Sequence, residues 1–326
     1  MNNNEQKSSI SSDNSAYSTA HFIREIGRGV KGARSLSFAD ANQLFMAILD
    51  GRVSDLELGA ILLAMRIKGE SVSEIAGFLQ AAESSIALLQ APCADYMPVV
   101  IPSYNGARKA ANLTPLLALL LARSGVPVLV HGVLQDAGRV TSAEIFRELN
   151  LLPVASHQEA GLQWQLGLPV MMPIEILAPR LSELLALRKI LGLRNSTHTL
   201  VKILQPFEQA ALRLTSYTHP EYATMLSDYF AGAADPARGG AFLMRGTEGE
   251  TVANTKKVQQ IDWFHAGLKT TLVEAQPGTD SVLSIPTDAS GTARWIQLVL
   301  DGQEPVPENI AEQVRFCLMA AKNKTR

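Results

Sequence analysis

The 326-residue sequence has little cysteine and no long apolar run. Its two cysteines, Cys93 and Cys317, make neither a disulfide framework nor a zinc-ligand set, which predicts a reducing, cytoplasmic location. The longest apolar run, residues 115–122, is far shorter than the ~20 residues that span a bilayer, and no secretory leader pattern is visible. We therefore expect a globular protein with no membrane partner.

The sequence also lacks the residue patterns of common catalytic sites. Its six histidines form no pair at metal-ligand spacing, and no serine or cysteine sits in a nucleophile elbow, so hydrolase and metalloenzyme functions are disfavoured. One close acidic pair, Glu248 and Glu250, adjoins a predicted strand end, and a solvated turn is favoured there over a magnesium site. We expect no catalytic residue and no metal site.

Hydrophobic periodicity divides the chain into three parts. Residues 1–20 are rich in Asn and Ser and predict a disordered tail. Residues 21–91 carry apolar residues at three-and-four spacing, which predicts an all-helical domain. Residues 92–326 alternate strand and helix patterns, which predicts a larger α/β domain with a mostly parallel central sheet. Helices near residues 174–204 interrupt this alternation and are candidates to join the helical domain.

Local signals place the elements inside these parts. Capping boxes at Ser71–Glu74 and Thr141–Glu144 each predict the start of a helix. Five apolar runs predict the central strands, at residues 98–101, 126–130, 168–172, 212–217 and 241–244.

One stretch has the layout of a phosphate-binding turn. A β-branched run ends at Ile101, a polar turn with one glycine and an Arg-Lys pair follows, and an apolar helix is expected from Thr114. The turn is nevertheless poor in glycine, and Tyr104 stands where a phosphate cradle needs bare backbone. Both a working cradle and a rebuilt loop remain open.

Basic residues gather in two other segments. The loop at residues 27–34 combines three glycines with three cations, for which a flexible solvated connection is an equal alternative. Residues 187–199 contain no acid, and Arg194, His198 and Lys202 share one face if this segment is helical. Such a face suits contact with a phosphodiester backbone, although a solvated face or a site for one small phosphorylated ligand is the alternative.

Three separated motifs resemble the anthranilate phosphoribosyltransferase and class II nucleoside phosphorylase superfamily, over about residue 22 to the last residue. Residues 103–106, Ser-Tyr-Asn-Gly, fall on the Thr-Gly-Gly-Asp of the family's first loop. The family's Lys-His-Gly-Asn motif has become Val-His-Gly-Val at residues 130–133. Thr251 and Val252 fall on its Asp-Glu magnesium pair. These departures remove the metal anchors and a phosphate cation that would hold phosphoribosyl diphosphate.

Three stretches, residues 101–109, 194–200 and 244–250, closely resemble the YbiB-type branch of this superfamily. The resemblance implies an anthranilate phosphoribosyltransferase-like, glycosyltransferase family 3 fold and a homodimer that binds DNA or RNA with low sequence specificity. A phosphoribosyltransferase with an altered donor site is the alternative, and only that alternative requires magnesium; otherwise we expect no cofactor.

Two groups of residues are the candidate site. The expected nucleic-acid contacts are Arg28, Lys31, Arg34, Arg108, Lys109, Arg188, Lys189, Arg194, His198 and Lys202. The expected residual phosphate pocket comprises Ser103, Asn105, Gly106, Asn112, Thr114, His131 and Gly132. For His131, which follows a strand where ligands of open α/β sheets bind, a turn histidine that caps the next segment is the alternative.

Overall fold

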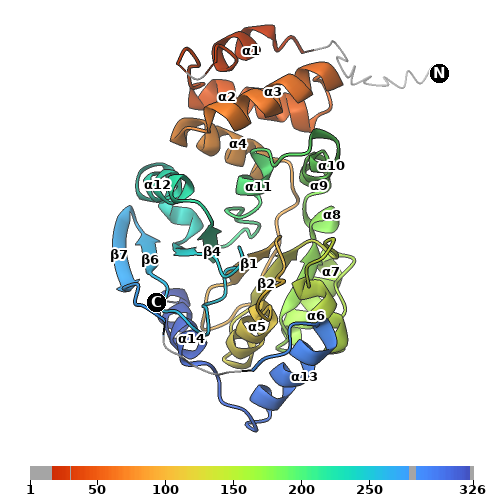
Figure 1. The fold of residues 1–326 in the computed structure, drawn as a ribbon, viewed down its shortest axis with the longest axis vertical. Helices are drawn as coiled ribbons and strands as arrows, with labels where there is room; N and C mark the ends of the chain where they lie inside the picture. The colour runs from red at the N-terminus through yellow and green to blue at the C-terminus, as the bar shows by residue number, and fades with distance from the viewer. Residues whose placement is uncertain (1–16, 30, 279–283, 324–326) are drawn as a thin grey trace, which may run out of the picture.

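The computed structural model describes residues 17–29, 31–278 and 284–323, and shows a helical layer stacked on an α/β layer (Figure 1). Most of the predicted tail, residues 1–16, lies outside the described residues. Thr19 is buried, and its hydroxyl donates a hydrogen bond to Glu57 at 2.7 Å. The folded part of the chain therefore begins before residue 20, because the hydrogen bond from Thr19 to Glu57 joins this segment to the third helix.

Four helices form the helical layer, and their starts follow local capping chemistry. They are α1 (Ala20–Ile26), α2 (Phe38–Leu49), α3 (Asp55–Lys68) and α4 (Val72–Ser84). The predicted capping box of Ser71 and Glu74 is formed at the start of α4. Helices α2 and α4 pack closely because Gly77 has no side chain, and a Cβ there would lie 2.8 Å from Ala41 Cβ.

The α/β layer is built on one seven-stranded sheet of order β3-β2-β1-β4-β5-β6-β7. Strands β1 to β5 are parallel and β6 and β7 are antiparallel, which confirms the mostly parallel sheet. Their bounds are β1 Val99–Ser103, β2 Val128–Gly132, β3 Val170–Pro173, β4 Leu212–Tyr217, β5 Ala241–Arg245, β6 Ile261–His265 and β7 Leu268–Val273.

Helices cover both faces of the sheet. One face packs against α5 (Thr114–Arg123), α6 (Ser142–Glu148), α13 (Ala289–Leu300) and α14 (Glu308–Ala321). On the other face, a continuous core joins the sheet to the helical layer. The other helices that contribute to this core are α7 (His157–Gln165), α8 (Ile174–Leu177), α9 (Pro179–Ala186), α11 (Thr197–Leu200) and α12 (Pro220–Asp228). The exposed helix α10 (Arg188–Leu191) follows α9, and the short helices η1 (Tyr229–Ala233) and η2 (Pro236–Arg238) follow α12. None of the described helices has both the length and the apolar character that crossing a bilayer requires.

The candidate site lies where the strand order reverses. Strand β1 leads to β2 on one side, and β4 lies beside β1 on the other side. Ligands of open α/β sheets bind outside the carboxyl ends of such strands. The loops after β1, β4 and β5 meet at this edge, beneath the helical layer (Figure 1).

Candidate functional site

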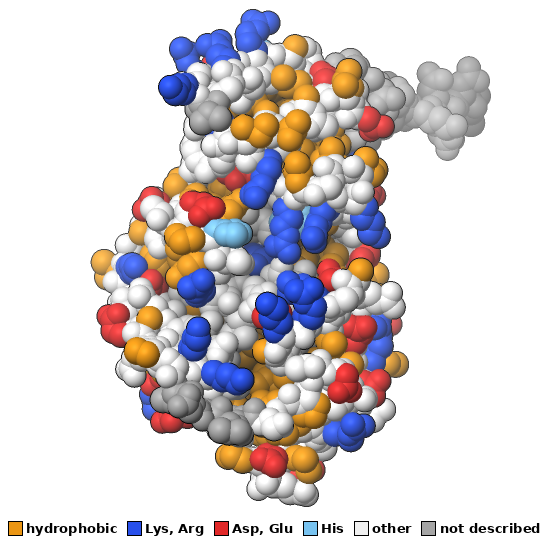
Figure 2. All heavy atoms as spheres, in the orientation of Figure 1, with side chains coloured by type: hydrophobic (Ala, Val, Ile, Leu, Met, Phe, Trp, Pro, Cys, Tyr) orange, Lys and Arg blue, Asp and Glu red, His pale blue; other side chains and the backbone are white. Residues whose placement is uncertain are grey.

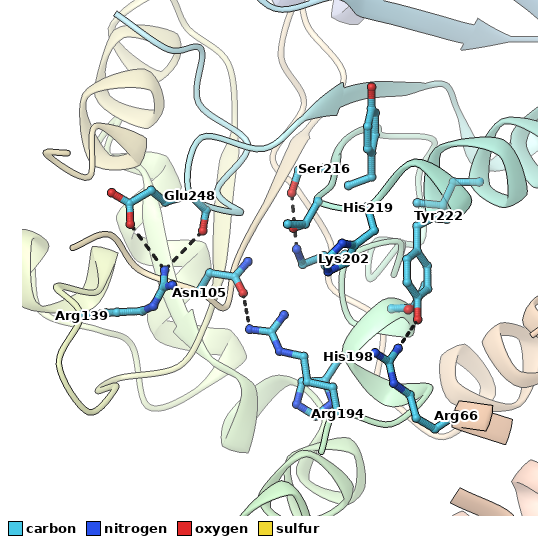
Figure 3. Close-up of a pocket in the computed structure, with 14 residues that line it drawn as sticks. Arg66, Asn105, Arg139, Arg194, His198, Lys202, Ser216, His219, Tyr222 and Glu248 are labelled. Atoms are coloured by element: carbon cyan, nitrogen blue, oxygen red, sulfur yellow. Dashed lines mark hydrogen bonds and ion pairs between the residues drawn. The ribbon is translucent and has the colours of Figure 1, made fainter. Parts of the chain in front are cut away.

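A cleft of about 270 Å³ opens between the carboxyl edge of the sheet and the helical layer (Figure 3). Cationic and aromatic side chains from distant segments line it, among them Arg66, Arg139, Arg194, Lys202, His219 and Tyr222. Its volume is close to the lower end of the ~300–1,000 Å³ that is common for ligand pockets. The cleft is therefore large enough for a small anionic group.

The segment that supplies two of these cations is less helical than predicted. Helix α11 has only four residues and begins at Thr197, so Arg194 precedes it and Lys202 follows it. Asn195 stays outside the start of the helix, where its side chain donates to the Leu184 carbonyl at 2.9 Å and accepts from Thr197 N–H at 3.0 Å. The prediction of one helix face is wrong, yet both cations and His198 line the same cleft.

Three cations of the cleft donate hydrogen bonds to uncharged acceptors. Arg66 donates to the Tyr222 hydroxyl at 2.8 Å, and Arg194 donates to Asn105 Oδ1 at 2.8 Å. Lys202 Nζ donates to the Gly249 carbonyl at 3.3 Å. Within the described ranges, no carboxylate comes within 4.0 Å of these three cationic groups. The cleft therefore carries excess positive charge, which attracts an anion.

Burial and mutual repulsion set the ionisation of this cluster. Burial and the nearby Arg194 lower the pKa of Lys202 to about 8, although Glu250 opposes this shift. Burial, followed by Arg194, lowers the pKa of His198 to about 4, so His198 is neutral at pH 7. Burial and the charges of Arg188 and Arg139 also lower the pKa of Arg194. Cations held close together in this way are stabilised by an incoming anion.

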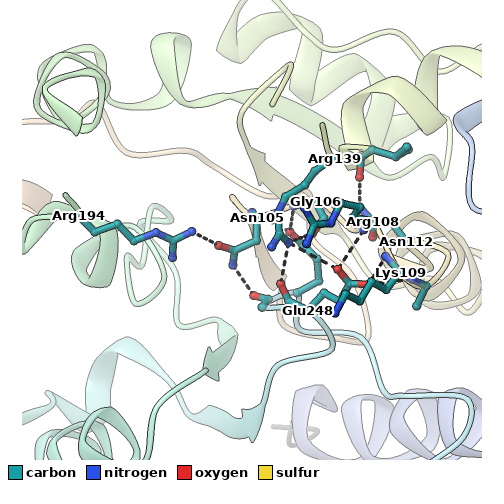
Figure 4. A network of polar contacts seen from close by, with 12 residues as sticks. Asn105, Gly106, Arg108, Lys109, Asn112, Arg139, Arg194 and Glu248 are labelled. Atoms are coloured by element: carbon teal, nitrogen blue, oxygen red, sulfur yellow. Dashed lines mark hydrogen bonds and ion pairs between the residues drawn. The ribbon is translucent and has the colours of Figure 1, made fainter. Parts of the chain in front are cut away.

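The loop after β1 is a cradle of backbone N–H donors, but the protein's own carboxylates occupy it (Figure 4). Glu250 Oε1 accepts from the N–H groups of Asn105 and Gly106 at 2.9 and 2.7 Å. Glu248 accepts from Arg108, Lys109 and Ala110 at 3.0, 2.6 and 2.7 Å. We call these five N–H groups the anion cradle. The interpretation of the two glutamates as a solvated turn is wrong, because their carboxylates satisfy this loop.

The seven residues of the expected phosphate pocket are all buried, and one of them, Asn105, also lines the cleft. Ser103 and Asn112 both hydrogen-bond to Ser142 Oγ, at 2.7 and 3.1 Å. The Thr114 hydroxyl lies 3.5 Å from Glu250 Oε2. Gly132 is required because a Cβ there would collide with the Ser103 carbonyl. Three of the seven residues, Asn105, Gly106 and Thr114, therefore contact the Glu250 carboxylate.

His131 lies inside the sheet instead of at a turn. It belongs to β2, is fully buried, and its Nδ1 lies 2.7 Å from the Tyr104 hydroxyl. Burial lowers the pKa of His131 to about 3, so the imidazole is neutral at pH 7. The interpretation of this histidine as a turn cap is therefore wrong, its place in a phosphate pocket stays a prediction, and Tyr104 is the partner that the β1 loop supplies.

The other predicted contacts are spread over the surface. Arg28 and Arg34 pair with Glu25 at 2.9 and 3.8 Å, and with exposed Lys31 they occupy the loop after α1, beyond the helical layer. The side chains of Arg108, Lys109, Arg188 and Lys189 are exposed on the β1 loop and α10. Figure 2 shows basic side chains around the central hollow and a separate group at the end of the helical layer.

Sequence reasoning missed several residues of the cleft. Arg66 comes from α3, where an exposed arginine is typical of any solvated helix face, and Arg139 precedes α6. His219 and Tyr222 come from the start of α12. Only the fold brings these positions to Lys202, because they lie on segments far apart in the sequence.

Known proteins share this architecture. Residues 20–85 match the model of the glycosyl transferase family, helical bundle domain. A crystal structure of anthranilate phosphoribosyltransferase from Thermus thermophilus superposes with a TM-score of 0.70 at 19% identity, over 91% of this chain and 89% of that chain. The Saccharomyces cerevisiae enzyme in complex with PRPP and Mg gives 0.66 at 14% identity, over 92% and 85%. The fold is that of the anthranilate phosphoribosyltransferases.

Sequence relatives define the branch within that fold. The uncharacterized protein YbiB of Escherichia coli strain K12 is 44% identical over 300 residues, which cover 91% of this chain and 92% of YbiB. Anthranilate phosphoribosyltransferase of Desulforamulus reducens is 24% identical over 297 residues, 86% of this chain and 81% of the relative. The chain belongs to the YbiB branch of the anthranilate phosphoribosyltransferase superfamily, as its motifs predict.

Proposed function

We propose that this protein binds nucleic acid through the sugar-phosphate backbone, with low sequence specificity, and that the cleft is the centre of the contact. The observation that carries this proposal is the set of three cations, Arg66, Arg194 and Lys202, whose hydrogen-bond partners are neutral. A phosphodiester supplies the missing negative charge, while the Tyr222 hydroxyl, which accepts from Arg66, has its own O–H to donate to phosphate or sugar.

Cations outside the cleft favour a polymer over one small ligand. Arg188 and Lys189 are exposed on α10, and Arg108 and Lys109 are exposed on the β1 loop. A single phosphate in the cleft reaches only the cations that line it. A chain of phosphates reaches the flanking cations as well, and each further contact releases counterions.

The transferase alternative needs a diphosphate and magnesium, and the residues present do not suit either. The N–H groups of the anion cradle already donate to Glu248 and Glu250. Buried Thr251 and Val252 stand where the superfamily pattern has the acidic pair, and Mg²⁺ prefers carboxylate oxygen. These features support the binding function over group transfer.

We also propose a homodimer joined through the helical layer. Leu56, Leu63 and Ile67 are 85%, 44% and 57% exposed and recur at helical spacing along α3. Phe38 and Met46 add exposed apolar area on α2. A second copy of the chain covers such a surface, and light scattering of the purified protein measures the resulting mass.

Fluorescence anisotropy of labelled single-stranded and duplex oligonucleotides tests the binding function. We expect saturable binding that weakens steeply between 50 and about 200 mM salt and differs little between unrelated sequences. The double variant Arg194→Ala/Lys202→Ala is expected to lower affinity on the order of a hundredfold or more, because each charge-assisted contact contributes ~1.5–3 kcal/mol.

A matched variant separates the cleft from overall charge. Arg294→Ala/Arg315→Ala removes the same two charges from exposed positions on α13 and α14, which cover the opposite face of the sheet. Its affinity is expected to stay within about twofold of the wild type. Equal losses in the two variants, or no binding by the wild type at low salt, contradict the proposal.

A further inference from the structure

The anion cradle consists of two adjacent groups of donors, and one turn fills both. Glu250 accepts two N–H groups, those of Asn105 and Gly106, and is fully buried. Glu248 accepts three N–H groups, at residues 108–110, and its side chain is 19% exposed. Successive backbone N–H groups that converge in this way form an anion-binding nest. The two groups are therefore two neighbouring anion positions in one loop.

The turn that supplies the carboxylates has an unfavourable residue at its tip. Thr247 and Glu250 exchange backbone hydrogen bonds at 3.0 Å in both directions, and the two residues between them have positive φ. Such turns favour Asn followed by Gly, but here Glu248 has a φ of 53°. Glutamate is tolerated in this conformation because its carboxylate accepts three backbone N–H hydrogen bonds, which offset the strain of the positive φ.

Surrounding residues hold the turn and the cradle together. Gly106 has a φ of 62°, and a Cβ there would lie 2.8 Å from the Val140 carbonyl, so the loop needs glycine for its close approach. The Arg139 guanidinium donates to the carbonyls of Gly106 and Glu248 at 3.2 and 3.4 Å and lies 3.7 Å from the Glu248 carboxylate. One arginine thus links the donor loop to the turn that occupies it (Figure 4).

We propose that Glu248 and Glu250 are a built-in anionic ligand that fills two phosphate positions of the loop, so that this chain excludes free diphosphate and its esters. A diphosphate is the ligand class with two adjacent anionic groups. It must displace two carboxylates that are tethered beside their donors, where their effective concentration is high. The inference concerns small diphosphates at the loop, which adjoins the cleft because Asn105 and Glu248 also line it, and it does not depend on nucleic-acid binding.

To test the proposal, the two carboxylates that fill the anion cradle are replaced while the turn that carries them is kept. Glu248→Asn places the favoured residue at the turn tip and removes one charge, and Glu250→Gln keeps the shape of the second side chain. Full-length protein labelled with ¹⁵N is titrated with inorganic diphosphate in the absence of metal. The amide signals of Gly106 and Lys109 report on the cradle itself, so that diphosphate held by the cations of the cleft is distinguished.

In the wild type, these two amide signals are expected to stay unchanged at diphosphate concentrations that saturate the double variant Glu248→Asn/Glu250→Gln. In the double variant they are expected to shift saturably, with an affinity at least about tenfold higher, which corresponds to ~1.4 kcal/mol. Glu159→Gln, which removes a charge from the exposed start of α7, is expected to behave as the wild type.

Two results overturn the proposal. One is that diphosphate shifts the Gly106 and Lys109 amide signals of the wild type at the same concentrations as those of the double variant. The other is that a folded double variant shows no shift at either amide. If circular dichroism shows that the double variant is unfolded, Glu248→Asn alone is titrated with inorganic phosphate. It frees only the three-donor position, and a shift of the Lys109 amide is then expected, while its absence refutes the proposal.

Discussion

The hydroxyl of Tyr104 lies 2.7 Å from Nδ1 of His131, and this contact joins the β1 loop to the middle of the sheet. Their rings meet edge to face at 5.4 Å between centroids. His131 Nε2 has no hydrogen-bond partner among the described residues. Tyr104 therefore supplies the polar contact of a histidine that the fold has buried, and the loop that carries the anion cradle is fixed to β2 through it.

Removal of this hydroxyl is expected to destabilise the fold. Tyr104→Phe keeps the aromatic packing but leaves His131 Nδ1 buried without a partner, which costs ~1–3 kcal/mol. Urea denaturation followed by circular dichroism measures the free energy of unfolding. Tyr96→Phe is the control, because Tyr96 is partly exposed and its hydroxyl makes no hydrogen bond within the described ranges. Equal effects of the two substitutions contradict the role of the contact.

The buried His131 is expected to make the folded state sensitive to acid. Its pKa is about 3 in the folded state against an ordinary value of 6.5, so between these values the unfolded chain binds the extra proton. The free energy of unfolding is therefore highest above pH 6.5 and falls as the pH drops toward 3, by about 2 kcal/mol between pH 6.5 and 5.

Denaturation of His131→Asn at several pH values checks this assignment. The variant is expected to be less stable at pH 7 but to lose about 2 kcal/mol less than the wild type between pH 6.5 and 5. Exposed His21→Asn is expected to keep the wild-type dependence on pH. An unchanged pH dependence in His131→Asn assigns the acid sensitivity to other groups.

Local signals predicted much of the fold. The capping boxes at Ser71–Glu74 and Thr141–Glu144 are both formed, because their partners lie three residues apart and need no tertiary context. The strand and helix alternation likewise predicted a parallel sheet, since parallel strands need crossover helices. These features depend on short stretches of chain, in which composition and residue spacing determine the local structure.

The site could be predicted only in part, because its contacts join distant segments. Asn105 N–H donates to Glu250 across 145 positions, and Arg66 donates to Tyr222 across 156. A Glu-Gly-Glu turn is typical of solvent-exposed loops unless the donor loop is known to lie beside it. Arg194 and Lys202 were identified for a helix face that does not form, and it is the bend of the chain around α11 that brings them together.

Close approach at Gly249 is expected to be essential to the occupied cradle. Gly249 has a φ of 99°, and a Cβ there would collide with the side chain of Asn105. Gly138 has a similar φ of 81° but open space around it. Gly249→Ala is expected to cost at least about 1 kcal/mol more than Gly138→Ala, because the control carries only the backbone strain. Thermal unfolding of the two variants measures the difference, and equal costs contradict the close packing of turn and loop.

The basic loop after α1 is expected to contribute less to nucleic-acid binding than the cleft does. Arg28 and Arg34 share Glu25, whereas Arg194 and Lys202 have neutral partners. Arg28→Ala/Lys31→Ala/Arg34→Ala removes three charges, yet its loss of affinity is expected to be smaller than that of Arg194→Ala/Lys202→Ala. The salt dependence provides the second measure, since each lost duplex phosphate contact lowers its slope by about 0.9. A larger change in affinity or in salt slope in the triple variant than in the double variant would place the main nucleic-acid contact on the helical layer instead of in the cleft.

Binding is also expected to weaken in mild alkali, because Lys202 has a pKa of about 8. The ammonium is charged below that value and becomes neutral as the pH rises through it, so affinity falls between pH 7 and 9. Lys202→Arg keeps a positive charge throughout this range, because the pKa of arginine exceeds about 12. Anisotropy titrations at pH 7, 8 and 9 are expected to show a decline in the wild type and a nearly constant affinity in Lys202→Arg. A parallel decline in both proteins would exclude Lys202 as the titrating contact, and a constant affinity in the wild type would show that its ammonium does not meet the phosphate.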